Sequence, residues 1–507
     1  MKKILVIDFG SQYTQLIARR LRELCVYSEV CPWDELPKLD EVEGFILSGG
    51  PESSNIEGNP TIHKDIFNTK KPILGICYGM QVLSFQEGGK VINEGKKEFG
   101  HAELNVMSVS NIFENIDTTI DVWMSHGDKV DSLPQGYEIT ASSSNSPIAA
   151  FQNQEKKYYG LQFHPEVTHT KYGIEIIKNF VDVCGVEQNW DASDILKQID
   201  ELVSNEVKDD NVLLALSGGV DSTVLAAVLY KILGDKLTCV MVDHGLLRKN
   251  EAKNVVQNLK EKIGLTVNLV NAEDIFLTKL SGVTEPETKR KIIGNTFIEV
   301  FENESKKLES INWLAQGTIY PDVIESAGNS KTKAKVIKSH HNVGGLPKNM
   351  KLSLIEPLRD LFKDEVRDLG KALKIKKSLI GRHPFPGPGL AIRIIGEVTK
   401  DRVKLLQAAD KIFIDILKEK NLYDKIWQAF CVLIPIKTVG VMGDERTYEN
   451  TIAIRAVNSV DGMTANWARI PFDALDLISS EIINNVKGVN KVVFDISNKP
   501  PSTIEWE

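Results

Sequence analysis

Residues 212–233 read VLLALSGGVDSTVLAAVLYKIL, and this stretch predicts the fold of the middle of the chain. The apolar run at 212–216 has the length of one buried strand. A glycine-rich loop at 217–222 follows it, and residues 223–233 then have the composition of a helix. A strand, a tight loop and a helix in this order form the first half of a βαβ unit. We therefore expect a parallel sheet with helices on both faces.

The loop of this unit has the composition of an anion-binding site. Its glycines let main-chain N–H groups approach an anion, its hydroxyls add donors, and the helix N-terminus adds partial positive charge. Asp221 predicts Mg²⁺, because a carboxylate repels phosphates unless a cation lies between them. The chain has no G-x-x-x-x-G-K-[ST], so the loop is not of the Walker type. An ordinary Ser/Gly turn capped by Asp221 is the alternative.

A second glycine-flanked turn between a predicted strand and a predicted helix lies nearer the start of the chain, where residues 75–79 read GICYG. The spacing G-x-Cys-x-G is that of a nucleophile elbow, in which small neighbours permit a strained backbone. The following helix N-terminus favours the thiolate form of Cys77. We expect the main-chain N–H of Tyr78 to point toward the oxyanion that forms during nucleophilic attack. The turn at Gly49-Gly50 offers a second N–H donor.

A histidine and a glutamate follow a predicted strand at 158–163. His164 and Glu166 are two residues apart, which places both on one face of an extended chain. A histidine oriented by a carboxylate is the base that a cysteine nucleophile requires. A buried cysteine is more commonly a core residue, and His-Pro-Glu is more commonly a turn. The occurrence of both motifs in one α/β unit favours a catalytic site.

The length and composition agree with a multidomain globular protein. The chain has 507 residues, 42% apolar and 26% charged, which excludes a disordered or disulfide-stapled chain. Its net charge of −8 argues against nucleic acid as a partner. The six cysteines lie far apart without zinc spacing and indicate reduced thiols. We expect a cytoplasmic location, because no signal peptide or apolar run of about 18 residues is present.

Changes of pattern divide the chain into three predicted domains. The first α/β pattern ends near residue 186, and the proline- and glycine-rich stretch RHPFPGPG at 382–389 marks a second boundary. We predict an α/β fold class with two doubly wound parallel-sheet domains followed by a small α+β domain. The last domain has a helix candidate and short strand candidates at 430–434, 452–457 and 491–496. The predicted domains cover residues 1–186, 187–389 and 390–507.

Two further groups of polar residues lie between the glycine-rich loop and the second boundary. Asp322 and Glu325 are three residues apart after a predicted strand and are candidates for holding Mg²⁺ or steering a proton. An acidic pair is more commonly solvated surface. The basic stretch at 331–341, which includes Lys338, has the composition of a mobile lid over a triphosphate, and a solvated face is its alternative.

Residues 1–185 resemble class I glutamine amidotransferases, whose motifs include G-x-C-x-G-x-Q and H-P-E. The resemblance implies that Cys77 attacks the glutamine side-chain amide, that His164 is the base and that Glu166 orients it. It also implies that Gly50 and Tyr78 supply oxyanion N–H groups, that Gln81 helps to hold glutamine, and that ammonia is the product. The stretch S-G-G-x-D-S resembles the loop of N-type ATP pyrophosphatases, which transfer AMP to a substrate oxygen. This implies ATP binding by Ser217, Gly218, Gly219, Val220, Asp221, Ser222 and Thr223.

The whole chain resembles the family of glutamine-hydrolysing GMP synthases, through R-H-P-F-P-G-P-G-L and K-P-P-x-T-I-E-W-E. This implies a carbon–nitrogen ligase that adenylates xanthosine 5′-monophosphate (XMP) with ATP and Mg²⁺ and aminates its C2 atom. The products are GMP, AMP, diphosphate and glutamate. The resemblance also implies a homodimer through 390–507, with no nucleic acid or membrane partner. The family's XMP contacts fall on Arg290, Gln428, Asp444, Lys499 and Glu505.

Three other functions compete with this interpretation. An NAD or asparagine synthetase shares the ATP chemistry, but the glutaminase domains of those enzymes do not resemble this cysteine elbow with H-P-E. An RNA-modifying protein on the same loop would need a basic surface or stacking aromatics, which the acidic total disfavours. A nucleotide-binding regulator without catalysis is disfavoured because every triad and loop residue is present.

Overall fold

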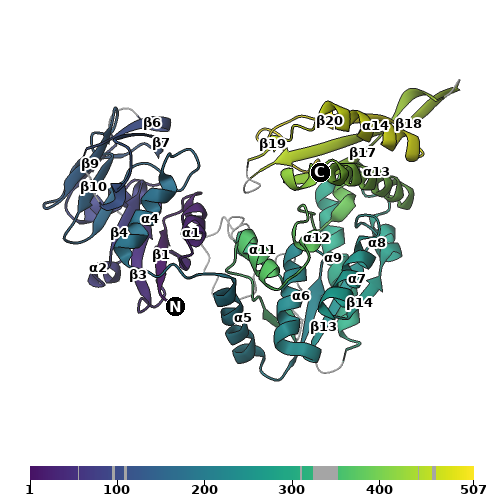
Figure 1. The fold of residues 1–507 in the computed structure, drawn as a ribbon, viewed down its shortest axis with the longest axis horizontal. Helices are drawn as coiled ribbons and strands as arrows, with labels where there is room; N and C mark the ends of the chain where they lie inside the picture. Colours follow the sequence, from purple (N-terminus) through teal and green to yellow (C-terminus); the bar gives the residue numbers. More distant parts are fainter. Residues whose placement is uncertain are drawn as a thin grey trace. The chain divides into compact units, whose positions relative to one another are not determined.

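The structure is a computed structural model that describes residues 1–54, 56, 58–93, 97–107, 111–308, 311–323, 352–442, 445–459 and 464–507. Its internal contacts divide the chain into two compact units, Met1–Asp194 and Ile195–Glu507. Figure 1 shows a sheet with packed helices in each unit.

The first unit is built on a nine-stranded mixed sheet in the order β2-β1-β3-β4-β11-β10-β9-β6-β7. Its first five strands are parallel, and each later neighbour pairs antiparallel. The strands are β1 (Lys3–Asp8), β2 (Ser28–Pro32), β3 (Val42–Leu47), β4 (Ile73–Ile76), β6 (Glu98–Val106), β7 (Thr119–His126), β9 (Glu138–Ser143), β10 (Ala150–Asn153) and β11 (Tyr158–Leu161). A separate pair is formed by β5 (Lys90–Ile92) and β8 (Lys129–Ser132).

The doubly wound parallel sheet predicted for this unit is confirmed for its first five strands. Up to α3 (Tyr78–Gln86) a helix separates successive strands except between β2 and β3, and the strands β6 to β11 are then joined without α-helices. Short connections of this kind join antiparallel neighbours, so half of the sheet is antiparallel. The other helices of the unit are α1 (Thr14–Glu23), α2 (Lys64–Asn68) and α4 (Gly173–Cys184).

Parallel pairing positions the first candidate site. The strands β3, β4 and β11 are neighbours and run in one direction. Their carboxyl ends therefore meet at one edge of the sheet, where open α/β sheets bind ligands. The three segments that follow these strands begin at Ser48, Cys77 and Gln162.

The second unit contains a five-stranded parallel sheet in the order β14-β13-β12-β15-β16. The strand order reverses beside β12, which is the position at which such sheets bind nucleotides. Helix α5 (Ala192–Val207) precedes this sheet. The strands are β12 (Asn211–Leu216), β13 (Leu237–Asp243), β14 (Val267–Asn271), β15 (Ile311–Ala315) and β16 (Ser353–Ile355). The helices are α6 (Val220–Leu233), α7 (Glu251–Ile263), α8 (Glu273–Leu280), α9 (Pro286–Ser305), α11 (Lys363–Ala372) and α12 (Lys377–Ile380).

Helix α6 begins three residues before the predicted start at residue 223. Gly219 is the N-cap in an extended conformation, with φ −69° and ψ 170°, so the helix starts directly at Val220. The glycine-rich loop is therefore shorter than predicted, and its residues lie at the helix N-terminus.

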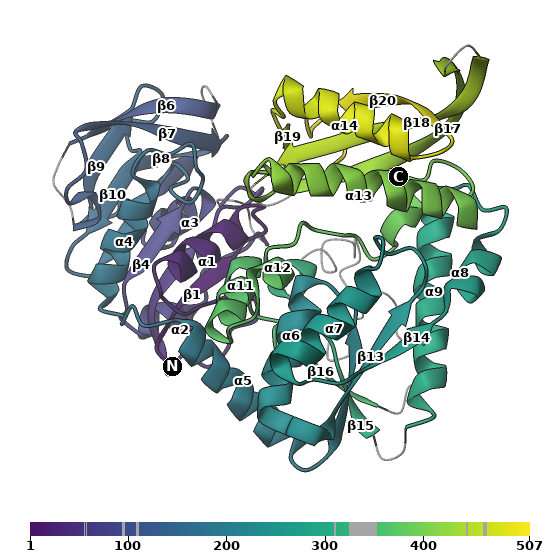
Figure 2. The same cartoon turned by 45° about the vertical axis from the view of Figure 1, so that its right-hand side comes forward.

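The last part of the chain forms a small antiparallel-dominated sheet, as predicted for an α+β domain. Two long paired strands replace the short strands predicted at 430–434 and 452–457. The elements are α13 (Lys400–Glu419), β17 (Gln428–Met442), β18 (Glu445–Asn458), β19 (Asn466–Trp467), α14 (Phe472–Asn485) and β20 (Val489–Asp495). Figure 2 shows both helices along one face of this sheet.

One apolar core joins this sheet to the parallel-sheet part of the second unit. It includes Leu246 and Phe276 from the parallel-sheet part and Phe413 and Leu433 from the last part. The division near residue 390 therefore stays a prediction. In the ranges that the structure describes, no helix has the length and apolarity needed to cross a membrane.

Candidate functional site

Cys77 lies on a strained turn between β4 and α3. Its backbone has φ 51° and ψ −106°, a conformation that non-glycine residues rarely adopt. The flanking glycines permit the turn, because a Cβ on Gly79 would lie 2.3 Å from the carbonyl oxygen of Leu47, and one on Gly75 would lie 2.6 Å from the backbone of Gly79. The G-x-C-x-G motif therefore follows from close packing, and it places the thiol at the N-terminus of α3.

His164 and Glu166 form a buried pair in the segment after β11. His164 Nδ1 lies 2.7 Å from Glu166 Oε1, so the spacing of two residues brings both side chains together. The carbonyl oxygen of Glu166 accepts a hydrogen bond from Arg20 Nε at 3.0 Å, and the ring of Tyr13 packs edge-on against the imidazole. These contacts fix the orientation of the ring.

The electrostatics of this pair favour a protonated imidazole. Burial opposes the charged form of His164, but the Glu166 carboxylate and hydrogen bonds with Cys77 and Glu166 outweigh burial and hold the pKa of His164 well above its ordinary value. A protonated imidazole beside Cys77 stabilises a thiolate.

The predicted oxyanion residues lie together at the elbow. A Cβ on Gly50 would lie 3.2 Å from the ring of Tyr78, so the two turns are in close contact. Within the described residues, the main-chain N–H groups of Gly50 and Tyr78 donate no hydrogen bond. Gln81 is buried, and its Nε2 donates to the carbonyl oxygen of Asp128 at 2.8 Å. Two free donors beside a nucleophile fit an oxyanion site.

The glycine-rich loop after β12 forms the second candidate site. Ser217 Oγ and Ser222 Oγ lie 2.9 Å apart across the loop, and Gly219 N donates to Ser217 Oγ at 3.3 Å. Gly218 has a left-handed φ of 78°, and its carbonyl oxygen accepts a hydrogen bond from Arg382 Nη1 at 2.6 Å. These hydrogen bonds fix the conformation of the loop, which leads directly into the N-terminus of α6.

A cavity of about 590 Å³ lies over this loop. Asp221 Oδ2 forms an ion pair with Lys363, whereas its buried Oδ1 contacts no hydrogen-bond partner in the described part of the chain. An unpartnered carboxylate oxygen facing an anion-binding loop fits a bound cation. Among the described residues no group of three or more His, Cys, Asp or Glu side chains is arranged to hold a metal.

The remaining predicted residues of this region fall into three groups. Arg290 and Asp322 line the cavity, and Asp322 Oδ2 also accepts a hydrogen bond from the main-chain N–H of Ile319 at 3.0 Å. Thr223 is buried in α6 and is not among the residues that line the cavity. Glu325, Lys338 and the rest of the predicted lid at 331–341 lie outside the described residues.

His244 also lines this cavity. Because it is buried, we expect the second unit to become less stable to unfolding at acid pH. Burial lowers the pKa of His244 to about 4, and its Nδ1 accepts a hydrogen bond from the Leu246 N–H at 3.1 Å, so the ring is neutral. In the unfolded chain the same histidine is protonated below about pH 6.5, whereas in the folded chain it stays neutral down to about pH 4. The free energy of unfolding therefore falls by about 3 kcal/mol in total as the pH falls from 6.5 to about 4. We expect His244→Asn, which keeps an acceptor, to reduce this pH dependence.

The measurement is hydrogen exchange of the peptide that contains residue 244, at pH 7 and pH 5 under mild urea. The wild-type chain should lose more protection at pH 5 than His244→Asn does. Equal losses in both proteins would contradict the assignment of His244.

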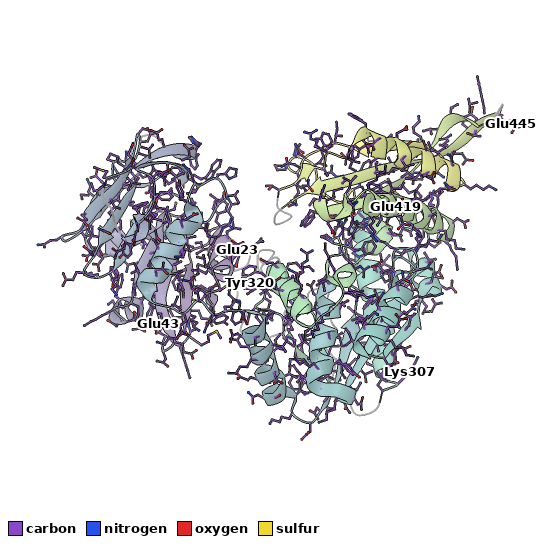
Figure 3. All side chains as sticks on the ribbon, viewed as in Figure 1. Glu23, Glu43, Lys307, Tyr320, Glu419 and Glu445 are labelled. Atoms are coloured by element: carbon purple, nitrogen blue, oxygen red, sulfur yellow. The ribbon has the colours of Figure 1, made fainter. Side chains whose placement is uncertain are left out.

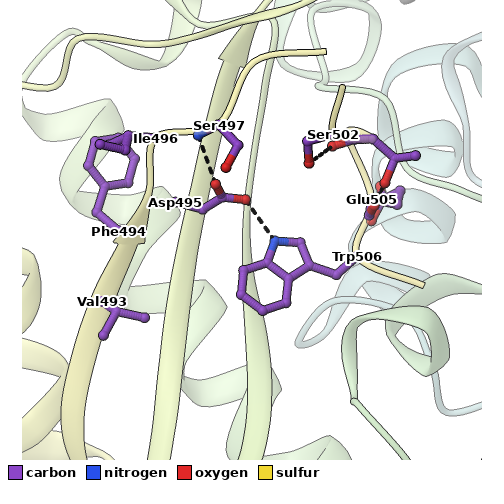
Figure 4. Close-up of a pocket in the computed structure, with 9 residues that line it drawn as sticks. Val493, Phe494, Asp495, Ile496, Ser497, Ser502, Glu505 and Trp506 are labelled. Carbon is purple, nitrogen blue, oxygen red and sulfur yellow. Dashed lines mark hydrogen bonds between the residues drawn. The ribbon is translucent and has the colours of Figure 1, made fainter. Parts of the chain in front are cut away.

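The predicted XMP contacts near the end of the chain are only partly brought together. Gln428 Nε2 donates to Glu505 Oε1 at 2.8 Å, but neither residue lines the cavity that contains Arg290. Lys499 pairs through its main chain with Ala465. Glu505 lines a different pocket of about 480 Å³ beside β20. Figure 4 shows this pocket, in which the indole of Trp506 donates to Asp495. Asp444 lies outside the described residues.

Sequence analysis missed several buried cations that hold this end of the chain. Arg393 is fully buried and binds both carboxylate oxygens of Glu505, at 3.0 and 2.7 Å. Lys289 is fully buried and forms an ion pair with Glu507. A single arginine in the apolar run LAIRII at 390–395 was the available signal, because a buried charge needs a partner. Lys363, which pairs with Asp221, was also missed, and no pattern in the sequence around it indicates a buried partner.

Comparison with known proteins assigns three parts of the chain to families. Residues 5–184 match the model of the class I glutamine amidotransferase family, residues 192–286 match the PP-loop domain, and residues 415–506 match the GMP synthase C-terminal domain. The glutamine-hydrolysing GMP synthase of Aquifex aeolicus is 57% identical over all of this chain and 99% of its own length. That of Xanthomonas oryzae pv. oryzae is 54% identical over 100% of this chain and 99% of its own length.

The chain belongs to the family of glutamine-hydrolysing GMP synthases. Its fold and activity class are therefore those predicted: a glutamine amidotransferase part, an ATP-using PP-loop part and a GMP synthase C-terminal part in one chain. The enzyme class is a carbon–nitrogen ligase with glutamine as the amide donor.

Proposed function

We propose that the first unit hydrolyses glutamine at Cys77. The thiolate attacks the side-chain amide carbon, and the N–H groups of Gly50 and Tyr78 stabilise the oxyanion. His164 donates its proton to the departing ammonia, and Glu166 keeps the ring oriented. Water then cleaves the thioester, which yields glutamate and restores the thiol. The strained turn, the buried imidazole–carboxylate pair and the free N–H groups support these roles.

We propose that the second unit adenylates the C2 oxygen of XMP. The loop that begins at Ser217 and the N-terminus of α6 bind the phosphates of ATP. Asp221 would hold Mg²⁺ through its unpartnered Oδ1, and the ion would neutralise phosphate charge when bound. Diphosphate leaves when AMP is transferred to the XMP oxygen. Ammonia then displaces AMP and yields GMP.

The proposed XMP contacts are Arg290, Gln428, Lys499 and Glu505, together with Asp444. Arginine and lysine fit the monophosphate, and the amide and carboxylate fit base edges. Asp322 and Glu325 are proposed for the adenylation step and Lys338 for the lid. The direct bond between Gln428 and Glu505 supports placing them in one subsite.

The observation that carries this proposal is the presence of two complementary sites in one chain, the Cys77 elbow and the PP loop with its orphan carboxylate oxygen. The test mixes the protein with ATP, Mg²⁺, glutamine and one purine monophosphate at a time, and measures AMP. AMP is expected with XMP and not with inosine or adenosine monophosphate. Equal AMP release with each acceptor would contradict XMP as the substrate.

A homodimer through residues 390–507 is part of the proposal. The hairpin of β17 and β18 carries exposed apolar side chains, and Val439 and Tyr448 pair across it with exposed fractions of 57% and 60%. Glu445 marks its outer end in Figure 3. Apolar side chains exposed together fit a second copy of this surface, and light scattering measures the molar mass.

We also propose a cytoplasmic location and the three domains 1–186, 187–389 and 390–507.

A further inference from the structure

A second buried histidine–glutamate pair lies in the first unit, outside the proposed triad. His126 ends β7 and Glu98 begins β6, and their side chains are 2% and 7% exposed. His126 Nε2 lies 3.3 Å from Glu98 Oε2. Residues 125–128, which we name the glutamine-side turn, contain this histidine. Buried ionisable groups are costly, so a pair that the reaction does not use needs an explanation.

The glutamine-side turn contacts the candidate glutamine site through two main-chain carbonyl groups. The carbonyl oxygen of Ser125 lies 3.5 Å from Cys77 Sγ. The carbonyl oxygen of Asp128 accepts a hydrogen bond from Gln81 Nε2 at 2.8 Å. The same oxygen lies 3.0 Å from His126 Nδ1. The His126 ring therefore holds the Asp128 carbonyl group directly, and Ser125 is the residue before His126 in the same turn.

The chemistry of these contacts requires a shared proton. The carbonyl oxygen of Asp128 only accepts, so His126 Nδ1 must carry a hydrogen. Nε2 of a neutral ring then offers a lone pair to the Glu98 carboxylate, which repels it. The contact is attractive only with a proton between Nε2 and Oε2. The pair therefore holds one proton, on the imidazole or on the carboxyl group.

Polar groups surround both members of the pair. Burial lowers the pKa of His126, although the Glu98 carboxylate and the main chain of Asp128 oppose this effect. Ser143 Oγ and Ser146 Oγ lie 3.3 and 3.2 Å from Glu98 Oε2, so the carboxyl group is held on more than one side. A carboxyl group that donates to Nε2 resembles a glutamine amide in that position.

We propose that His126 and Glu98 share one buried proton and thereby position the glutamine-side turn for glutamine binding. Both are positioning residues, because they act through Ser125 and Asp128. The inference rests on the proposed role of Cys77 as the glutamine nucleophile. It adds a determinant of glutamine affinity that belongs to β6 and β7.

The test compares Glu98→Leu and Glu98→Gln in the full chain. Glutamine slows the alkylation of Cys77 by iodoacetamide, and the half-protecting concentration measures glutamine binding. Glu98→Leu is expected to raise this concentration, and the KM for glutamine, by about tenfold or more, because Nε2 loses the proton shared with Glu98 and keeps only the longer contact with Ser146 Oγ at 3.4 Å among the described residues. The kcat should change less than about threefold. Glu98→Gln should stay near the wild-type values, because its amide donates to Nε2.

A matched control is Glu103→Leu, the same change at an exposed position of β6. Thermal unfolding checks that each variant folds, and Glu98→Ala replaces Glu98→Leu if the latter does not. Equal glutamine affinity in the Leu, Gln and wild-type proteins, or equal losses in the Leu and Gln variants, would overturn the proposal. If glutamine does not protect Cys77 in the wild-type chain, the proposed function itself has failed.

Discussion

The Cys77→Ala variant is expected to lose glutamine-dependent GMP formation by at least about 1,000-fold while ammonia still supports the reaction. The reason is the division of chemistry between two units, because the strained elbow and the imidazole–carboxylate pair belong to the first unit. The PP loop belongs to the second unit and contains no part of this site. The measurement is GMP formation with glutamine, and separately with ammonium at alkaline pH.

Cys31→Ala is the matched control for this variant. Cys31 is as buried as Cys77, with an exposed fraction of 5% for each, but burial raises the pKa of the Cys31 thiol to about 12. Cys31 should therefore resist iodoacetamide, and its loss should leave glutamine-dependent activity unchanged. A parallel loss of both activities in Cys77→Ala would show that the two-site division is wrong.

The Asp221→Asn variant should lose ATP-dependent adenylation by about 100-fold or more with either nitrogen source. The change removes the negative charge of the carboxylate that pairs with Lys363 and offers its other oxygen to a cation, and it replaces one of the two oxygens by an amide nitrogen, which does not bind Mg²⁺. The Mg²⁺ concentration that gives half-maximal AMP formation should also rise. Alkylation of Cys77 should proceed at the wild-type rate, because the two residues lie in separate units.

Asp209→Asn makes the same chemical change on a fully exposed side chain just before β12. It should leave AMP formation and its Mg²⁺ dependence unchanged. If Asp221→Asn turned over ATP normally, the proposed metal role would be untenable. If the activity of Asp221→Asn fell with no change in Mg²⁺ dependence, the loss would be assigned to the ion pair of Asp221 with Lys363 and not to a bound metal.

Local sequence predicted the parts of both sites that local geometry controls. The elbow at Cys77 follows from two glycines, and the 2.7 Å contact between His164 and Glu166 follows from a spacing of two residues. The PP loop follows from its glycines and hydroxyls beside a buried strand. In each case the interacting atoms lie within a few residues of one another.

Long-range pairing was not predictable in the same way. Lys363 meets Asp221 across 142 residues, and Arg393 meets Glu505 across 112. No single segment contains both partners, so no local pattern indicates the pairing. The antiparallel half of the first sheet was missed for a related reason, because the pattern of strands and helices in residues 1–92 was extended to the whole unit.

The sequence by itself determined the strand–turn–helix segments at the two sites and the reactive residues on them, because backbone strain, helix termini and short-range spacing are properties of a few consecutive residues. It also determined the family, through motifs that span the whole chain. Only the tertiary structure decided which buried charges meet. It brought His126 to Glu98 and, within the part of the chain that the structure describes, left one oxygen of Asp221 without a hydrogen-bond partner. Burial makes a charge costly unless distant segments supply its partner, and that partner is set by how the strands and helices pack.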